Sequence, residues 1–171
     1  MRVITLSFLV TLISTLVYSA VIKWEAFAIS QSKTYNLSDN RMYSSYSNEG
    51  IFLTDMGVRG EVECQGIVEI DVKKTSSNVM CKFIDQDSDI FFGHFKAISD
   101  ADINTQGTQS FSFEEGTGKW KELIGEECIG ATSSISTKDL GEGSIKGKIM
   151  WAGKCYISDA TLERVKNYKK P

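Results

Sequence analysis

The sequence has only one proline, Pro171, and it is the last residue. Proline cannot donate a backbone hydrogen bond and interrupts central strands, so its scarcity leaves every strand of a sheet free to pair. Histidine is equally scarce, because His94 is the only one. The four cysteines include no C-x-x-C pair, so a tetrahedral zinc site is not expected. The sequence therefore predicts neither a metal nor any other cofactor.

Motifs that bind phosphates or activate nucleophiles are also lacking. The glycines of Gly116-Thr117-Gly118 do not continue into the fingerprint of a nucleotide site. His94 has no Cys, Ser or Asp in local register with which to form a nucleophile–base pair. The sequence gives no positive sign of an enzyme.

There is no excess of basic residues. The chain has 19 Lys and Arg against 22 Asp and Glu, a net charge of −3. Nucleic-acid-binding domains usually carry a basic face, and only a short tail is basic here, so no nucleic-acid partner is predicted. A length of 171 residues with 42% hydrophobic and 24% charged residues is ordinary for one globular domain with a buried core.

The first 20 residues have the pattern of a secretory signal peptide. Met1-Arg2 is a short positive segment, residues 3–17 are uncharged and largely apolar, and Tyr18-Ser19-Ala20 supplies small residues for cleavage after Ser19 or Ala20. An uncleaved anchor is the alternative, but the run is shorter than the about 20 residues that span a bilayer. We therefore predict a signal peptide over 1–20 and a single exported domain over 21–171, periplasmic or extracellular, with no membrane span after cleavage.

Because export is predicted, we expect the cysteines to form disulfides. Cys64, Cys81, Cys128 and Cys155 allow three pairings, and an oxidising compartment favours disulfides. We predict Cys64–Cys81 and Cys128–Cys155, because each pair joins segments that look like neighbouring strands.

Alternating hydrophobicity is the strongest structural signal. Residues 62–72 and 145–157 place apolar or small side chains at every second position, which is typical of strands with one buried face. Residues 21–30 read as a first strand, 131–143 as a loop or weak strand, and 159–171 as one or two helical turns capped by Ser158 or Asp159. Many alternating strands and almost no helix predict an all-β fold, an antiparallel barrel of about eight strands with a short C-terminal helix.

The central stretch runs from Phe111 to Gly130 and reads as a strand, a tight glycine turn at 116–118 and the start of another strand. Trp120 follows that turn, either at a pocket mouth or packed beside a hairpin. The candidate ligand-binding residues of the barrel interior are Val62, Val68, Ile70, Phe111, Phe113, Trp120, Ile149 and Trp151.

Two polar features have a functional and a plainer interpretation. Asp85, Asp87 and Asp89 have the spacing of a calcium loop, but Ile90 and Lys96 occupy the positions that usually hold Gly and Glu, so a solvated hairpin turn is favoured. His94 could act as a general base, but a surface or pocket-lining histidine on a strand is favoured.

The order of these features resembles a group of uncharacterised exported bacterial proteins related to the allene oxide cyclase-like (calycin-like) barrel. The residues that carry the resemblance are Ile22-Lys23-Trp24, Val58-Arg59, Glu63-Cys64, Cys81, the acidic turn 85–89, Ile90-Phe91, Phe111-Ser112-Phe113 and 116–120. The resemblance implies an eight-stranded antiparallel barrel, and related barrels hold small apolar molecules. It places no catalytic residue on this chain.

Three functions follow as hypotheses. The first is an exported barrel that binds a small apolar ligand, because barrels of about eight strands either fill with side chains or hold one ligand. The second is a structural or protein-interaction module with a filled barrel. The third is a cyclase or isomerase acting on a lipid-derived substrate, which needs His94 and a carboxylate inside the cavity.

Overall fold

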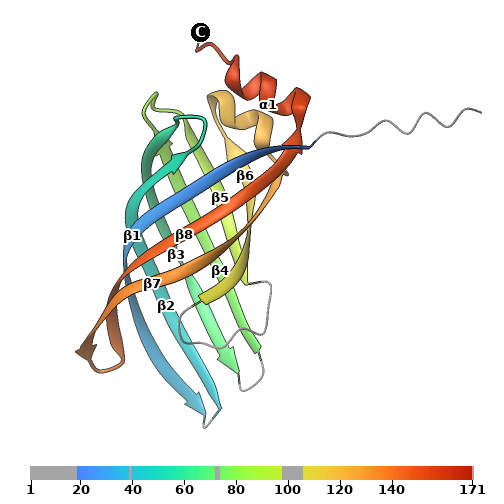
Figure 1. Ribbon diagram of the computed structural model, residues 1–171. Helices are drawn as coiled ribbons and strands as arrows, with labels where there is room; N and C mark the ends of the chain where they lie inside the picture. Colours follow the sequence, from blue (N-terminus) through green and yellow to red (C-terminus); the bar gives the residue numbers. More distant parts are fainter. Residues whose placement is uncertain (1–18, 39, 72–73, 98–105, 171) are drawn as a thin grey trace, which may run out of the picture.

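Eight antiparallel strands form a closed barrel in the computed structural model, which describes residues 19–38, 40–71, 74–97 and 106–170 (Figure 1). Each strand pairs with its neighbours in the chain, and β1 closes the ring against β8. The elements are β1 (Ser19–Ser38), β2 (Arg41–Thr54), β3 (Arg59–Asp71), β4 (Lys74–Asp85), β5 (Ile90–Ala97), β6 (Gln106–Gly116), η1 (Gly118–Leu123), β7 (Glu127–Gly141), β8 (Ser144–Ser158) and α1 (Asp159–Lys166). The all-β prediction, the eight antiparallel strands and the short C-terminal helix are confirmed.

The predicted signal peptide lies almost entirely outside the described residues. The described chain begins with β1 at Ser19, next to the predicted cleavage site. Ser19 pairs with Ser158, and the ladder between β1 and β8 continues to Lys33 and Ser144.

One strand is longer than the sequence pattern indicated, and a second segment, which the pattern left open as a loop or weak strand, is a strand. β1 was expected over residues 21–30, yet it continues to Ser38, because residues 31–38 pair with β2. Residues 131–141 belong to β7, although Ser and Thr dominate there. A strand in a closed barrel is held by ladder hydrogen bonds on both edges, so it does not require a strongly apolar face.

The expected simple turn after β6 was wrong. A 3-10 helix, η1, separates β6 from β7 and carries Lys119, Trp120 and Leu123 into the protein. Gly118 makes this possible, because its φ is +54° and a Cβ there would meet Asp89 Oδ2 at 2.0 Å. The segment covers one end of the barrel, while β6 and β7 still pair as antiparallel neighbours on either side of it.

Both predicted disulfides are present, between Cys64 and Cys81 and between Cys128 and Cys155. Each pair sits directly opposite in an antiparallel ladder, with a Cα–Cα distance of 4.0 Å. All four side chains point into the barrel and are buried. The bonds link β3 to β4 and β7 to β8.

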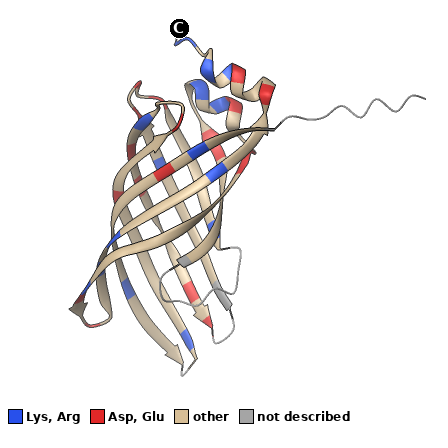
Figure 2. Ribbon diagram, in the orientation of Figure 1, with Lys and Arg blue, Asp and Glu red and all other residues tan. Residues whose placement is uncertain are grey.

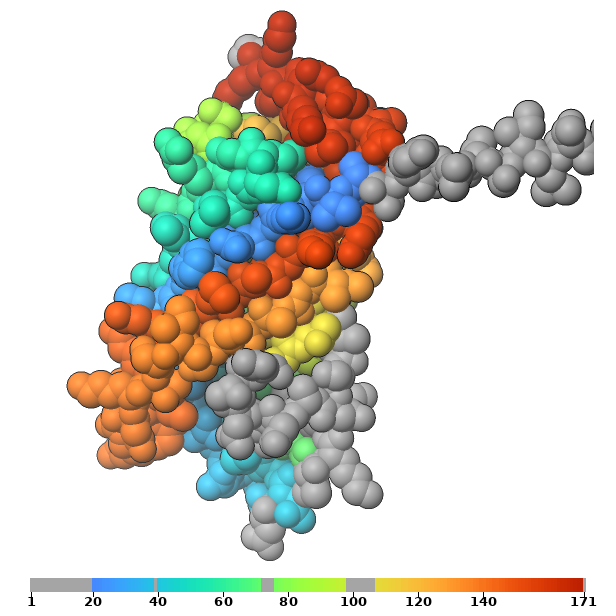
Figure 3. All heavy atoms as spheres, viewed as in Figure 1, coloured from blue at the N-terminus to red at the C-terminus, as the bar shows by residue number. Residues whose placement is uncertain are grey.

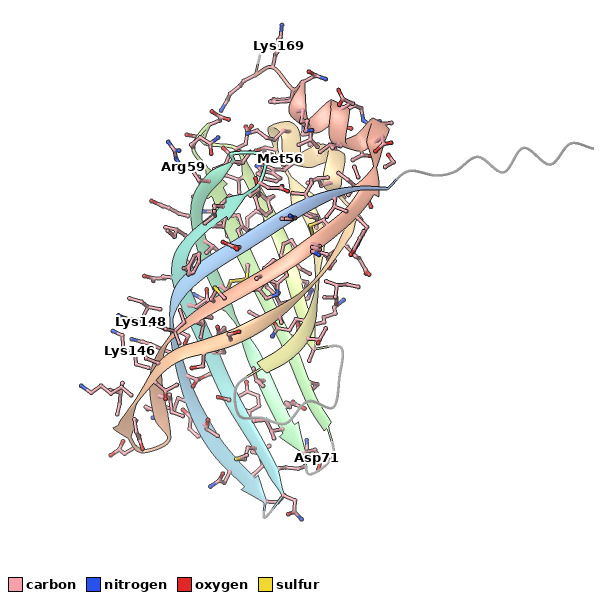
Figure 4. The ribbon with its side chains drawn as sticks, viewed as in Figure 1. Met56, Arg59, Asp71, Lys146, Lys148 and Lys169 are labelled. Carbon is pink, nitrogen blue, oxygen red and sulfur yellow. A yellow bond between two sulfur atoms is a disulfide. The ribbon has the colours of Figure 1, made fainter. Side chains whose placement is uncertain are left out.

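The two ends of the barrel differ. Met56 and Arg59 lie at the end that carries η1 and α1, Asp71 lies at the opposite end, and Lys146 and Lys148 project outward (Figure 4). Lys, Arg, Asp and Glu are interspersed over the outer surface and crowd at the α1 end (Figure 2). On the face shown in Figure 3, side chains of β1, β7 and β8 form a continuous wall.

α1 packs over the same end. Ser158 caps it, as the sequence suggested, by accepting a hydrogen bond from the backbone N–H of Thr161 at 3.0 Å. Val165 is buried, and Arg164 forms an ion pair with Glu122 of η1. This end of the barrel is therefore closed by η1 and α1 together.

Candidate functional site

An aromatic cluster fills the closed end of the barrel. Trp24 lies at its centre, with ring centroids 5.2 Å from Phe83, 5.2 Å from Phe111 and 6.4 Å from Trp120. The first two pairs are edge-to-face and the third is stacked, and both arrangements are common between aromatic rings. The remaining members of the cluster are Phe52, Phe91 and Phe113, and all seven rings are at most 2% exposed. This half of the interior is packed solid.

A cavity begins where the cluster ends. Its volume is about 170 Å³, counted as the space open to the centre of a water molecule. Trp24 and Phe83 bound it on the side of the cluster. Its aliphatic wall consists of Ala26, Ala28, Val62, Val68, Val79 and Ile149. The barrel is therefore filled at one end and hollow beside that filling.

Glycines make room for one wall of the cavity. A Cβ on Gly153 would meet Trp151 Cη2 at 2.2 Å, and a Cβ on Gly130 would meet Trp151 Cζ2 at 2.5 Å. The Trp151 ring can lie against β7 and β8 only because both positions lack a side chain. The ring is 4% exposed and lines the cavity.

Two polar pairs also line the cavity. On β2, Asn48 Nδ2 donates to the hydroxyl of Tyr46 at 2.9 Å. On the opposite side, the Thr132 hydroxyl of β7 donates to Gln109 Oε1 of β6 at 2.7 Å. β2 and β6 are four strands apart in a ring of eight, so the pairs face each other across the interior.

Hydrogen-bonding capacity is left over at both pairs. Asn48 Oδ1 is buried without a partner among the described residues, and the same part of the chain offers the Gln109 amide a partner for its oxygen but not for its NH₂. Burial raises the pKa of Tyr46 above 10.0, against the smaller lowering effect of the Asn48 hydrogen bond, so its hydroxyl stays protonated and can donate.

Two of the three indole N–H groups also lack a partner within the described part of the chain, namely those of Trp24 and Trp151. A buried donor without an acceptor costs about 1–3 kcal/mol. Aromatic packing therefore holds these two rings in place. Trp120 differs, because its N–H donates to Asp85 at 2.9 Å.

Asp85 belongs to an ionic cluster under η1. Lys119 Nζ lies 2.5 Å from Asp85 Oδ2, 2.9 Å from Asp87 Oδ2 and 3.6 Å from Asp89 Oδ2. The side chains of Asp85 and Asp89 are 0% and 6% exposed. The solvated turn predicted for residues 85–89 is therefore wrong for these two carboxylates, which the η1 ammonium group holds inside the protein.

This arrangement also accounts for the calcium-like spacing. A lysine stands where the loop would hold a cation, and none of the described residues form a cluster suited to a metal ion. Burial alone would raise the pKa of Asp85, but hydrogen bonds from Lys119, Trp120 and the backbone together lower it below 3.8. Burial would lower the pKa of Lys119, yet its bonds to Asp85 and Asp87 raise it above 10.5.

His94 faces outward from β5, on the strand face opposite to Phe91 and Phe95. Its Nε2 contacts Asn78 Oδ1, and its Nδ1 lies 3.9 Å from Glu114 Oε1. It does not line the cavity. The acid–base cluster that the enzyme hypothesis needs inside the barrel is absent among the described residues.

The eight candidate interior residues divide into three groups. Val62, Val68, Ile149 and Trp151 line the cavity. Phe111, Phe113 and Trp120 belong to the solid aromatic cluster, and Ile70 is half-buried outside the lining. The cavity also uses Trp24, Tyr46, Asn48, Gln109 and Thr132, which sequence reasoning missed.

No protein-family model, curated protein or solved structure matches the chain. None of the described helices is long and apolar enough to cross a membrane. The two disulfides are compatible with an exported protein.

Proposed function

We propose that this protein is an exported barrel that holds a small, largely apolar molecule in its interior cavity. The observation that carries the proposal is the cavity itself, which lies beside a cluster of buried aromatic rings. Well-packed interiors rarely leave voids larger than a water molecule, and an apolar cavity of about 150 Å³ can bind benzene. The space available here suits a molecule built on one ring or a short chain.

Export and a relation to allene oxide cyclase-like barrels are part of this proposal. The disulfides support export, because such bonds persist in oxidising compartments. The eight-stranded ring supports the relation only at the level of architecture. A cyclase or isomerase is less well supported, since His94 lies on the outer surface.

A protein-interaction module is the second candidate, favoured by apolar side chains on the outer surface. Ile51 of β2 is 57% exposed and directly opposite Phe27 of β1, and Leu53 is 38% exposed two residues further along β2. This role requires no cavity. An Ile51→Lys variant that loses a specific partner while keeping its ligand binding would separate it from the first candidate.

Ethylbenzene is a suitable probe for the cavity. A ligand that binds only the folded state raises the melting temperature, and at tenfold excess over its dissociation constant we expect a rise of about 3 °C. Val68→Phe places a ring in the cavity and should abolish the rise. Ile67→Phe, on the outer face of the same strand, should keep it.

If ethylbenzene fails to raise the melting temperature of the wild type, the cavity is not a ligand site. An equal rise in the wild type and Val68→Phe would place the ligand elsewhere. Either result overturns the proposal.

A further inference from the structure

We infer that the ligand is an uncharged amphiphile, whose polar head both donates and accepts hydrogen bonds. Its apolar body would lie toward Trp24, Phe83 and Trp151, and its head between the Tyr46–Asn48 and Gln109–Thr132 pairs. This inference rests on the proposed function and adds the chemical class of the ligand.

The lining separates into two regions along the barrel. Toward the closed end it is aromatic and aliphatic, where Trp24, Phe83 and Val62 meet. The polar side chains of the lining are the two pairs on facing strands and Ser77 of β4, whose hydroxyl accepts from the backbone N–H of Ala97. An apolar ligand would leave this second region without a partner, which is unfavourable for buried polar groups.

The hydrogen-bonding groups that these pairs leave unused define the polar head of the ligand. The Tyr46 hydroxyl accepts from Asn48, and neither its proton nor the Gln109 amide NH₂ has a hydrogen-bond partner among the described residues. Asn48 Oδ1 is an acceptor with no partner among the described residues. Donors thus face each other across the cavity with an acceptor beside one of them. A hydroxyl or a primary amide matches this arrangement, because each can donate and accept.

The lining residues also argue against a charged ligand. None of the described residues that line the cavity is a Lys, Arg, His, Asp or Glu. An ionised carboxylate would lose its hydration without gaining an opposite charge, which strongly disfavours its binding. A fatty acid anion is therefore a poor match for this cavity, whereas the corresponding alcohol or amide is a good one.

Three probes of similar size test the inference by calorimetric or thermal-shift titration. Benzyl alcohol differs from ethylbenzene by a hydroxyl in place of a methyl group, and phenylacetate carries a charge. Tyr46→Phe removes the Tyr46 hydroxyl, which also accepts from Asn48, and Gln109→Leu removes the facing amide, which also accepts from Thr132. Tyr43→Phe changes a tyrosine on the outer face of the same strand and serves as the control.

We expect Tyr46→Phe and Gln109→Leu each to weaken benzyl alcohol by about fivefold to tenfold, the size of one lost hydrogen bond. Ethylbenzene should change by less than about twofold in the same variants, since it makes no such bond. Tyr43→Phe should change neither probe, and phenylacetate should not bind.

Each other outcome overturns the inference in a recognisable way. If both variants change the affinities for benzyl alcohol and ethylbenzene equally, the polar pairs bind water or each other and do not recognise the polar head of the ligand. If phenylacetate binds as tightly as benzyl alcohol, the ligand need not be uncharged. If ethylbenzene does not bind the wild type either, the proposed function fails and this inference fails with it.

Discussion

Lys119 Nζ lies 2.5 Å from Asp85 Oδ2, and this contact joins η1 to the turn between β4 and β5. The Asp85 carboxylate also accepts hydrogen bonds from Trp120 Nε1 and the backbone N–H groups of Asp87 and Asp89. One buried carboxylate therefore fixes both the lysine and the tryptophan of the segment that closes the barrel.

Removing the lysine should destabilise the protein substantially. Lys119→Met leaves the Asp85 carboxylate buried without its counter-ion, and the loss of one partner of a buried pair costs about 3 kcal/mol or more. Denaturant unfolding of this variant beside Lys121→Met, an exposed neighbour, would measure the difference. Equal stability of the two variants would show that the buried pair contributes little.

Acid should weaken the same contact. The pKa of Asp85 is lower in the folded state than its ordinary 3.8, so the folded protein takes up this proton less readily than the unfolded chain. The stabilisation is complete above pH 3.8 and is lost as the pH falls from there through the lowered folded pKa. The stability gap between the wild type and Asp85→Asn should hold at neutral pH and narrow below pH 3.8. A gap that persists to the lowest pH tested would contradict this assignment.

Alkali should act through Lys119 in the opposite direction. Its folded pKa is raised above 10.5, so its contribution is complete below pH 10.5 and is lost as the pH rises through the raised value. The gap between the wild type and Lys119→Met should therefore narrow only above pH 10.5. Unfolding titrations at a series of alkaline pH values check this. A stability gap that already narrows near neutral pH would contradict the raised pKa of Lys119.

Breaking either disulfide should lower the free energy of unfolding. The disulfides join residues 17 and 27 positions apart, and loops of these lengths correspond to about 3 kcal/mol each in the chain-entropy account. The double variants Cys64→Ala/Cys81→Ala and Cys128→Ala/Cys155→Ala should each lower the free energy of unfolding by about that amount. Thermal unfolding that is unaffected by reductant would show that the bonds are dispensable.

Trp24 should be the most sensitive position of the core. Its ring contacts those of the other six cluster members, so Trp24→Ala should cost about 3–5 kcal/mol. Tyr35→Ala, on the same strand but 48% exposed, provides the control and should change stability by less than about 0.5 kcal/mol. A small effect at Trp24 would mean that the aromatic cluster can repack around a hole.

The strands and disulfides were predictable because both follow from local alternation. Val62, Cys64 and Val68 share one face of β3 with period two, and a strand in a barrel needs one buried face. Because β3 and β4 were predicted to be neighbours, Cys64 and Cys81 were expected to lie close together, and they are directly opposite in the ladder. The polar half of β1 was missed, because hydroxyl-rich residues such as Ser32 and Thr34 resemble a loop, although they pair with β2.

The site was less predictable because it depends on which side chains meet across the barrel. Phe113 and Val62 lie on similar strand faces, yet one is packed in the solid end and the other lines the cavity. Alternation gives the face of a residue but not its height relative to strands far away in the chain. The pairing of Lys119 with Asp85, 34 residues apart, is likewise a tertiary contact that no local spacing signals.

Native mass spectrometry of the protein, purified without denaturation, tests the central claim most directly. We expect the wild type and Ile67→Phe to carry the same additional small mass, lost on denaturation, and Val68→Phe to lack it. The account would be contradicted by bound mass that is equal in Val68→Phe, or by wild-type protein that has only the mass of its chain and takes up no added ethylbenzene.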